Sequence, residues 1–267
     1  MTVTERNNVR IAGAGERAMI FAHGFGCDQN MWRYVAPQFE RDFTVVLFDH
    51  VGAGRADASA YDHERHGTLS GYATDVLAIC EELGLERAIF VGHSVSAMIG
   101  VLAAKQQPAR FRALVLVGPS PRYLDDEGYV GGFSRSDVDE LLDSLESNYL
   151  GWSSAMAPAI MGNPDRPELG TELANSFCQT DPDIAAQFAR VTFLSDNRED
   201  LAAIDMPTLI LQCSDDIIAP RSVGEFVHTK MPGSELVQLQ ATGHCPNLSA
   251  PAETTAAIRE FVDRLAS

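Results

Sequence analysis

Residues 88–100 read Ala-Ile-Phe-Val-Gly-His-Ser-Val-Ser-Ala-Met-Ile-Gly, and they are the most informative part of the sequence. An apolar run leads into a tight turn centred on Ser94, and a helical pattern follows the turn. A strand, a strained turn and a helix in this order form a nucleophile elbow, which presents a serine hydroxyl at the end of a sheet strand. The neighbours of the serine must be small, as Gly92 is. Ser96 stands where the pattern favours glycine, which weakens the match without forbidding the geometry. The alternative is an ordinary serine that caps a helix.

Short apolar runs, rich in β-branched residues, alternate with helical patterns on both sides of this stretch. Nearly continuous hydrophobicity of this kind is typical of parallel strands that are buried on both faces. Apolar residues at helical spacing predict helices at Tyr72–Leu83 and Ile258–Leu265. The alternation predicts the α/β class, with a doubly wound, mostly parallel sheet. The predicted strands are Ala18–Ala22, Phe43–Phe48, Ala88–Val91, Ala113–Val117, Thr208–Gln212 and Glu235–Leu239.

The alternation of strand and helix stops after Gly118 and resumes at Pro207. Between them the pattern indicates no strand, whereas residues 138–145 and 183–194 carry apolar side chains at helical spacing. An all-helical insertion after a central strand is placed to cover the carboxyl ends of the strands, where ligands bind in open α/β sheets. We therefore expect this insertion to be a lid. The predicted division is an α/β core formed by residues 1–120 and 205–267, with the lid at residues 121–204.

Composition excludes several classes of protein. With 45% hydrophobic and 21% charged residues in 267 positions, the chain resembles folded proteins rather than disordered or fibrous ones. Its 37 acidic and 20 basic residues leave a formal charge of -17 at pH 7, which disfavours nucleic acid and membrane partners. No apolar run reaches the roughly 18 residues of a membrane span, and residues 1–10 lack the apolar region of a signal peptide. We expect a cytoplasmic protein.

No cofactor and no metal are expected. Residues 13–18 fit the dinucleotide pattern G-x-G-x-x-A, but a strand follows them where that pattern must open a helix. Asp215 and Asp216 are adjacent carboxylates without a second cluster at ligand spacing. The five scattered cysteines form no C-x-x-C pair, which indicates free thiols, and we interpret Cys27 and Cys245 as small packing residues.

A serine nucleophile needs a base within hydrogen-bond reach and a carboxylate that fixes the tautomer of that base. In this architecture the chain order is serine, acid, histidine. His244 alone among the seven histidines lies in a loop between a late strand and a helix, so it is the predicted base. The alternative is a loop histidine that only bonds to backbone. Asp215 and Asp216 compete as the acid, and we favour Asp216, which directly precedes the turn Ile-Ile-Ala-Pro.

The oxyanion of an acyl-transfer intermediate needs backbone N–H donors. These normally come from the residue after the nucleophile and from a loop after an early strand. Val95 occupies the first position, and Phe25 in the segment His-Gly-Phe-Gly occupies the second. The glycines at positions 24 and 26 allow the backbone to approach a ligand closely. We expect Phe25 and Val95 to supply the oxyanion hole.

The chain as a whole resembles the α/β-hydrolase family. Within that family it is similar to the branch that holds the bacterial stress-signalling hydrolase RsbQ and the plant receptors for strigolactones and karrikins. The resemblance implies the α/β-hydrolase fold, with Ser94, Asp216 and His244 as the triad. The segments that carry the resemblance are residues 23–29, 48–52, 92–100, 119–124, 147–149 and 243–246.

The resemblance also implies a lid of four helices over a mostly apolar cavity. Four aromatic residues would contribute to the wall of this cavity, although each fits the packed interior of the lid equally well. They are Tyr123, Phe133, Trp152 and Phe193.

Three functions remain open from the sequence. The first is a serine hydrolase that cleaves a small, mostly apolar ester or lactone through an acyl-enzyme. The second is a slowly hydrolysing signalling receptor of the RsbQ type that acts through a protein partner. The third keeps the triad and cleaves a carbon–carbon bond of a diketone. Haloalkane dehalogenation is disfavoured because its nucleophile in this fold is an aspartate, whereas position 94 is serine.

Overall fold

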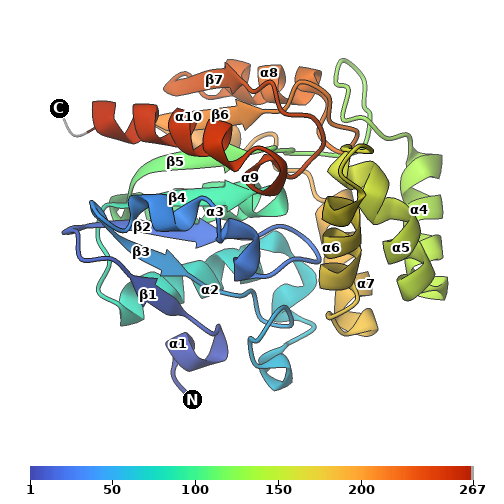
Figure 1. Cartoon of the computed structure of the whole chain (residues 1–267), viewed down its shortest axis with the longest axis horizontal. Helices are drawn as coiled ribbons and strands as arrows, with labels where there is room; N and C mark the ends of the chain where they lie inside the picture. The colour runs from blue at the N-terminus through green and yellow to red at the C-terminus, as the bar shows by residue number, and fades with distance from the viewer. Residues whose placement is uncertain (266–267) are drawn as a thin grey trace.

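The computed structural model describes residues 1–265 and contains one twisted sheet of seven strands within that range (Figure 1). The strand order is β1-β3-β2-β4-β5-β6-β7, and all neighbours are parallel except β1 and β3. This topology confirms the predicted doubly wound α/β fold. The strands are β1 (Arg10–Ala12), β2 (Arg17–Ala22), β3 (Phe43–Leu47), β4 (Ala88–His93), β5 (Phe111–Val117), β6 (Thr208–Gln212) and β7 (Ser234–Gln238).

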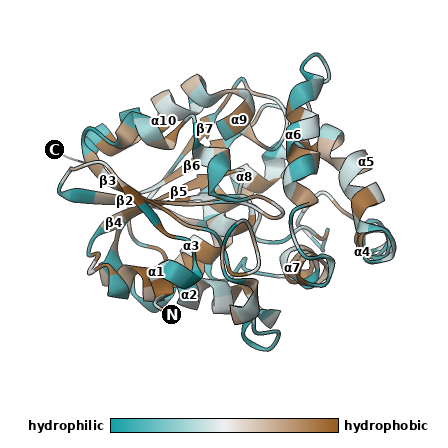
Figure 2. Cartoon of the chain, turned by 60° about the horizontal axis from the view of Figure 1, so that its bottom comes forward, coloured by the Kyte–Doolittle hydropathy of each residue, from teal (hydrophilic) through white to brown (hydrophobic). Residues whose placement is uncertain are grey.

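Alternate residues of the central strands build the two layers of the core. In β4, Ile89 and Val91 join the hydrophobic cluster that contains Phe261, whereas Phe90 joins the cluster on the opposite face. Successive strand side chains point to opposite faces, so a continuous apolar run fills both layers. Figure 2 shows α9 and α10 on one side of the sheet and α1, α2 and α3 on the other. A further helix, α8, contacts β6 and β7. The bounds of these helices are α1 (Val3–Arg6), α2 (Leu69–Glu82), α3 (Val95–Gln106), α8 (Arg221–Lys230), α9 (Pro246–Ser249) and α10 (Pro251–Arg264).

Four further helices lie between β5 and β6 in the chain and gather beside the sheet (Figure 1). We call them the helical segment: α4 (Arg135–Ser147), α5 (Tyr149–Met161), α6 (Pro167–Phe177) and α7 (Pro182–Leu194). The start of α4 is fixed by a capping box between Ser134 and Asp137, and α6 begins with a proline, whose fixed φ suits a first helical position. Among residues 1–265, none of the helices is long and apolar enough to cross a membrane.

Candidate active site

The turn between β4 and α3 holds Ser94 in a strained backbone conformation. Its φ is 56° and its ψ is −124°, in a region that favours glycine. A hydrogen bond of 2.8 Å from the Ser94 amide to the carbonyl of Val117 ties the turn to β5. A Cβ at Gly92 would lie 2.4 Å from the backbone oxygen of Ser96, so only glycine fits there. The sheet therefore imposes the conformation that exposes the serine hydroxyl to a ligand.

His244 lies against Ser94, and Asp216 lies behind His244. The Nε2 atom of His244 is 2.7 Å from Ser94 Oγ, and its Nδ1 atom is 2.8 Å from Asp216 Oδ2. All three residues are buried. A carboxylate at Nδ1 fixes the ring proton there, which leaves Nε2 to accept the proton of the serine hydroxyl. The other carboxylate oxygen, Oδ1, accepts backbone N–H bonds from Ile218 and Ala219, at 2.8 and 3.1 Å.

The two adjacent aspartates have different surroundings. Asp216 is 6% exposed and faces His244. The side chain of Asp215 is exposed, and its backbone carbonyl accepts a 2.7 Å hydrogen bond from the amide of Gly243. Asp215 therefore shapes the histidine loop through its backbone, and Asp216 is the carboxylate in contact with the imidazole.

A second imidazole supports the histidine loop. The Nε2 atom of His93 lies 2.7 Å from the backbone carbonyl oxygen of His244. Burial lowers the pKa of His93 to about 3, so its ring is neutral and donates the Nε2 proton to that carbonyl. Burial raises the pKa of Cys27 to about 12 and also raises the pKa of Cys245, so both thiols stay protonated.

The loop after β2 passes directly over the nucleophile. A Cβ at Gly24 would lie 2.6 Å from His93 Nδ1 and 3.3 Å from Ser94 Cβ. Glycine at this position therefore permits the close approach of the backbone that carries Phe25. Val95 is the first residue of α3, so its amide follows the nucleophile directly. Both predicted oxyanion donors thus belong to segments that border Ser94.

A small, mostly apolar cavity of about 40 Å³ lies above the serine. Three of the four predicted aromatic residues, Tyr123, Trp152 and Phe193, line it. Within residues 1–265, Phe133 lies outside the wall and packs behind it, with ring centroids 6.5 Å from Tyr123 and 6.0 Å from Phe193. The wall also includes residues that the sequence analysis did not select for it: Cys27, Ile160, Leu173, Phe177, Thr192 and Ile218.

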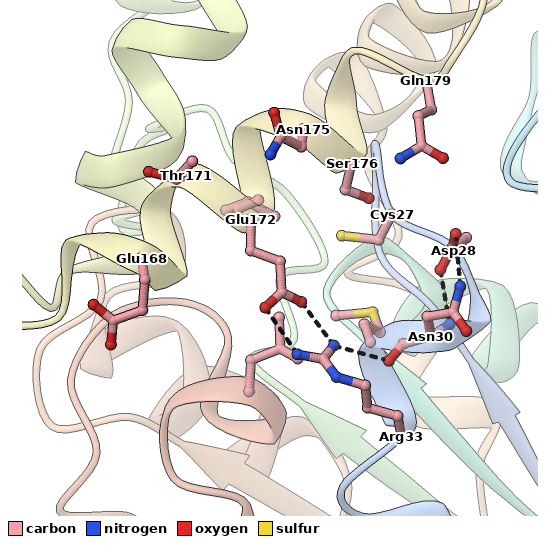
Figure 3. Close-up of a pocket in the computed structure, with 13 residues that line it drawn as sticks. Cys27, Asp28, Asn30, Arg33, Glu168, Thr171, Glu172, Asn175, Ser176 and Gln179 are labelled. Atoms are coloured by element: carbon pink, nitrogen blue, oxygen red, sulfur yellow. Dashed lines mark hydrogen bonds and ion pairs between the residues drawn. The ribbon is translucent and has the colours of Figure 1, made fainter.

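An outer groove of about 460 Å³ lies between α6 and the 3-10 helix Gln29–Trp32 (Figure 3). Two ion contacts cross it, from Arg33 Nη1 to Glu172 Oε1 at 2.7 Å and from Arg33 Nη2 to Glu172 Oε2 at 2.8 Å. Cys27 and Leu173 line both the groove and the inner cavity, so a single layer of side chains separates the two spaces. In the described part of the chain, no group of three or more His, Cys, Asp or Glu side chains is placed to hold a metal.

Comparison with known proteins shows the family of the chain. The family model described as "Alpha/beta hydrolase family" matches residues 19–258. A karrikin insensitive 2 receptor of Petunia hybrida is 42% identical over 250 residues, 93% of each chain. A strigolactone esterase of Arabidopsis thaliana is 38% identical over 263 residues, 98% of each chain. The structure of a hydrolase from Oleispira antarctica superposes with a TM-score of 0.95 at 41% identity, covering 98% of this chain and 96% of that one.

Proposed function

The chain belongs to the alpha/beta hydrolase family, and on that premise we propose that it cleaves small, mostly apolar esters or lactones with Ser94 as nucleophile. The observation that carries the proposal is the chain of contacts from Ser94 Oγ to His244 and on to Asp216, at 2.7 and 2.8 Å. Ser94, at one end of this chain of contacts, lies in an apolar cavity that is small enough to exclude bulk water around the reacting atoms.

In the proposed reaction, Ser94 Oγ attacks the carbonyl carbon of the ester while His244 Nε2 takes the hydroxyl proton. The amides of Phe25 and Val95 donate hydrogen bonds to the oxyanion. His244 then protonates the leaving alcohol, and an acyl group remains on Ser94. A water molecule, deprotonated by His244, attacks the acyl-enzyme; the bond to Ser94 Oγ breaks, His244 returns the proton to Ser94, and the acid is released. With a lactone, the alcohol and the acid stay joined in one product.

The wall of the cavity favours an apolar acyl group with one polar contact. Burial raises the pKa of Tyr123 above its ordinary value, so its hydroxyl stays protonated and is able to donate a hydrogen bond to a ligand. The rings of Trp152 and Phe193 supply apolar surface. These groups match an ester or lactone, which has few polar atoms and no charge.

The hydrolase proposal is tested by the time course of nitrophenolate release from p-nitrophenyl acetate, for the wild type and for Ser94→Ala. Sustained release of many equivalents by the wild type, lost in the variant, would support a turning-over esterase. Loss of about three to six orders of magnitude is expected for removal of the nucleophile. Thermal shift with a substrate analogue checks that Ser94→Ala still binds. Release that persists in Ser94→Ala would overturn the assignment.

A second function, ligand-dependent signalling through a protein partner, is favoured by the contacts of Phe25. Its ring packs against Trp152 in α5, Phe177 in α6 and Phe188 in α7, with centroids 6.2, 5.9 and 5.7 Å apart. A ligand in the cavity that displaces the Phe25 ring would therefore change the packing of three helices of the helical segment at once. A signalling receptor requires such a link between its ligand and its outer surface.

The signalling function predicts a burst of about one equivalent of nitrophenolate followed by slow turnover. It also predicts that acylation of Ser94 changes hydrogen exchange in α5, α6 and α7, and that Ser94→Ala shows no such change with the same reagent. Rapid turnover with unaltered exchange in these helices would contradict the signalling function and leave the esterase.

A further inference from the structure

Ser96 is a fully buried polar residue at the position where the elbow pattern favours glycine. Its Oγ lies 2.5 Å from the backbone carbonyl oxygen of His23 and 2.8 Å from Nε2 of His50. The exposed fraction of Ser96 is 0%. A buried hydroxyl at a crowded turn is costly unless both its donor and its acceptor capacity are used. Here each has a partner, which indicates a specific role for the hydroxyl.

The direction of every hydrogen bond in this group follows from the number of protons. Ser96 has one proton, which it donates to the carbonyl of His23. It must therefore accept the Nε2 proton of His50. Burial holds the pKa of His50 well below its usual value, so the ring is neutral and carries its proton on Nε2.

His23 completes the group. The backbone amide of His50 donates to Nε2 of His23 at 3.0 Å, and Nδ1 of His23 lies 2.9 Å from the carbonyl oxygen of Gly24. Because Nε2 accepts, Nδ1 carries the proton and donates it to Gly24. The hydrogen bonds of the three side chains therefore involve no conflict between donors, and they fix the backbone of residues 23 and 24.

Ser96 and His23 both lie close in sequence to the proposed oxyanion donors. Ser96 directly follows Val95, and His23 lies two residues before Phe25. Val95 and Phe25 are the two proposed oxyanion donors, and they come from segments that are distant in sequence. The hydroxyl of Ser96 donates a hydrogen bond to the carbonyl of His23 and so links those two segments directly.

We propose that Ser96, held by His50, is a positioning residue that sets the separation of the two oxyanion donors. The inference rests on the proposed hydrolase function. Oxyanion donors act at distances of about 2.7 to 3.1 Å from the developing charge, so a small shift of the Phe25 loop weakens one of them. The substrate in its ground state depends less on this separation than the tetrahedral intermediate does.

The test is Ser96→Ala, with Ser234→Ala as the matched control. Ser234 has the same kind of contacts far from the site: its Oγ donates to the carbonyl of Met231 at 2.6 Å and lies 2.9 Å from Nδ1 of His228. We expect Ser96→Ala to lower kcat for p-nitrophenyl acetate about 10- to 100-fold with KM nearly unchanged. We expect Ser234→Ala to retain wild-type kcat and KM.

A trifluoromethyl ketone adds a readout that a merely structural role would not move. This inhibitor forms a tetrahedral adduct with serine and needs the oxyanion hole, whereas a planar amide analogue of the substrate does not. Ser96→Ala should weaken the ketone by the same factor as kcat/KM and leave the amide unchanged. Equal losses for both ligands, or a kcat within twofold of the wild type, would overturn the proposal.

Two variants of His50 carry the test if Ser96→Ala fails to fold. His50→Leu removes the donor to Ser96 Oγ, and His50→Gln keeps an N–H donor. We expect the leucine variant to lower kcat about tenfold and the glutamine variant to recover most of it. Equal kcat values for the two would contradict the positioning role. Activity in Ser94→Ala would instead contradict the hydrolase function itself, so the two failures are distinguishable.

Discussion

The Nε2 atom of His93 lies 2.7 Å from the backbone carbonyl oxygen of His244, so the residue before the proposed nucleophile holds the loop of the proposed base. The donor in this contact is a neutral imidazole that is 2% exposed. Protonation of that ring would bury a charge. The contact therefore has a consequence for the dependence of stability on pH.

Burial lowers the pKa of His93 to about 3 and also lowers those of His23 and His50. An unfolded histidine titrates near pH 6.5. As the pH falls below about 6.5, the unfolded chain takes up protons that the folded chain does not, so the free energy of unfolding decreases toward the lowered folded pKa. The stabilising contribution is fully present above pH 6.5. Between its folded and its unfolded pKa, each such histidine adds a slope of about 1.4 kcal/mol per pH unit.

Urea unfolding between pH 7 and pH 5 measures this slope. His93→Gln keeps an N–H donor toward His244 but cannot be protonated. We expect it to reduce the pH dependence of the free energy of unfolding by the contribution of one proton, about 1.4 kcal/mol per pH unit. A slope unchanged in His93→Gln would contradict the neutral, buried state of this residue.

The two adjacent aspartates should respond very differently to the same substitution. Asp216→Asn removes the acceptor that fixes the His244 proton on Nδ1, and we expect kcat for p-nitrophenyl acetate to fall by about 10⁴-fold. Asp215→Asn changes an exposed side chain and should alter kcat less than threefold. Comparable losses in both variants would show that charge near the loop, rather than the contact with His244, sets the rate.

The size of the inner cavity should limit the acyl chain. A space of about 40 Å³ is far below the roughly 300 Å³ of pockets for drug-sized ligands, so acetate esters should be cleaved faster than hexanoate esters. Phe193→Ala shortens a side chain of the wall and so enlarges the cavity. It should raise the hexanoate-to-acetate ratio of kcat/KM by about tenfold. Phe226→Ala, in α8 outside the cavity, is the matched control. An unchanged ratio in Phe193→Ala would mean that the helical segment opens wide before binding.

Two ionic contacts differ in burial and should differ in their effect on stability. Asp75 is 1% exposed and contacts Arg6 at 2.7 Å, His66 at 2.9 Å and also Arg65. Asp75→Asn leaves Arg6 and Arg65 without their counter-charge, and we expect a loss of about 3 to 5 kcal/mol. Glu172→Gln breaks the partly exposed contact with Arg33 and should cost less than about 1 kcal/mol. Urea unfolding of the two variants checks the difference, and equal losses would contradict it.

The central strands were predictable because they are apolar on both faces. Thr208–Gln212 has the predicted bounds, and Ala113–Val117 extends to Phe111 in the structure. β1 escaped prediction because it has three residues and lies at the sheet edge, where burial imposes no apolar pattern. The expected division into core and lid, and the expected cytoplasmic location, stay predictions.

The candidate site was predictable where covalent order determines geometry. The chain order of serine, acid and histidine, together with the turn after Asp216 and the loop of His244, selected residues that lie in contact. The cavity wall was harder to predict, because α5 has a weak helical period and Phe177 lies at the end of α6, in a stretch for which the sequence analysis predicted no helix. Ser96 looked like a defect in the elbow, since its partners, His23 and His50, are far from it in sequence.

The histidine loop is fastened to the end of α5. The amide of His244 donates to the carbonyl of Ile160 at 2.8 Å, and a Cβ at Gly243 would lie 1.8 Å from the carbonyl oxygen of Met161. Lifting this end of α5 would pull His244 away from Ser94. An outward movement of the helical segment would therefore keep His244 in contact with Ser94 only if this end of α5 stays in place. The outer groove along α6 lies away from this junction, and there the partly exposed ion pair of Glu172 and Arg33 is the contact that would have to break for α6 to move.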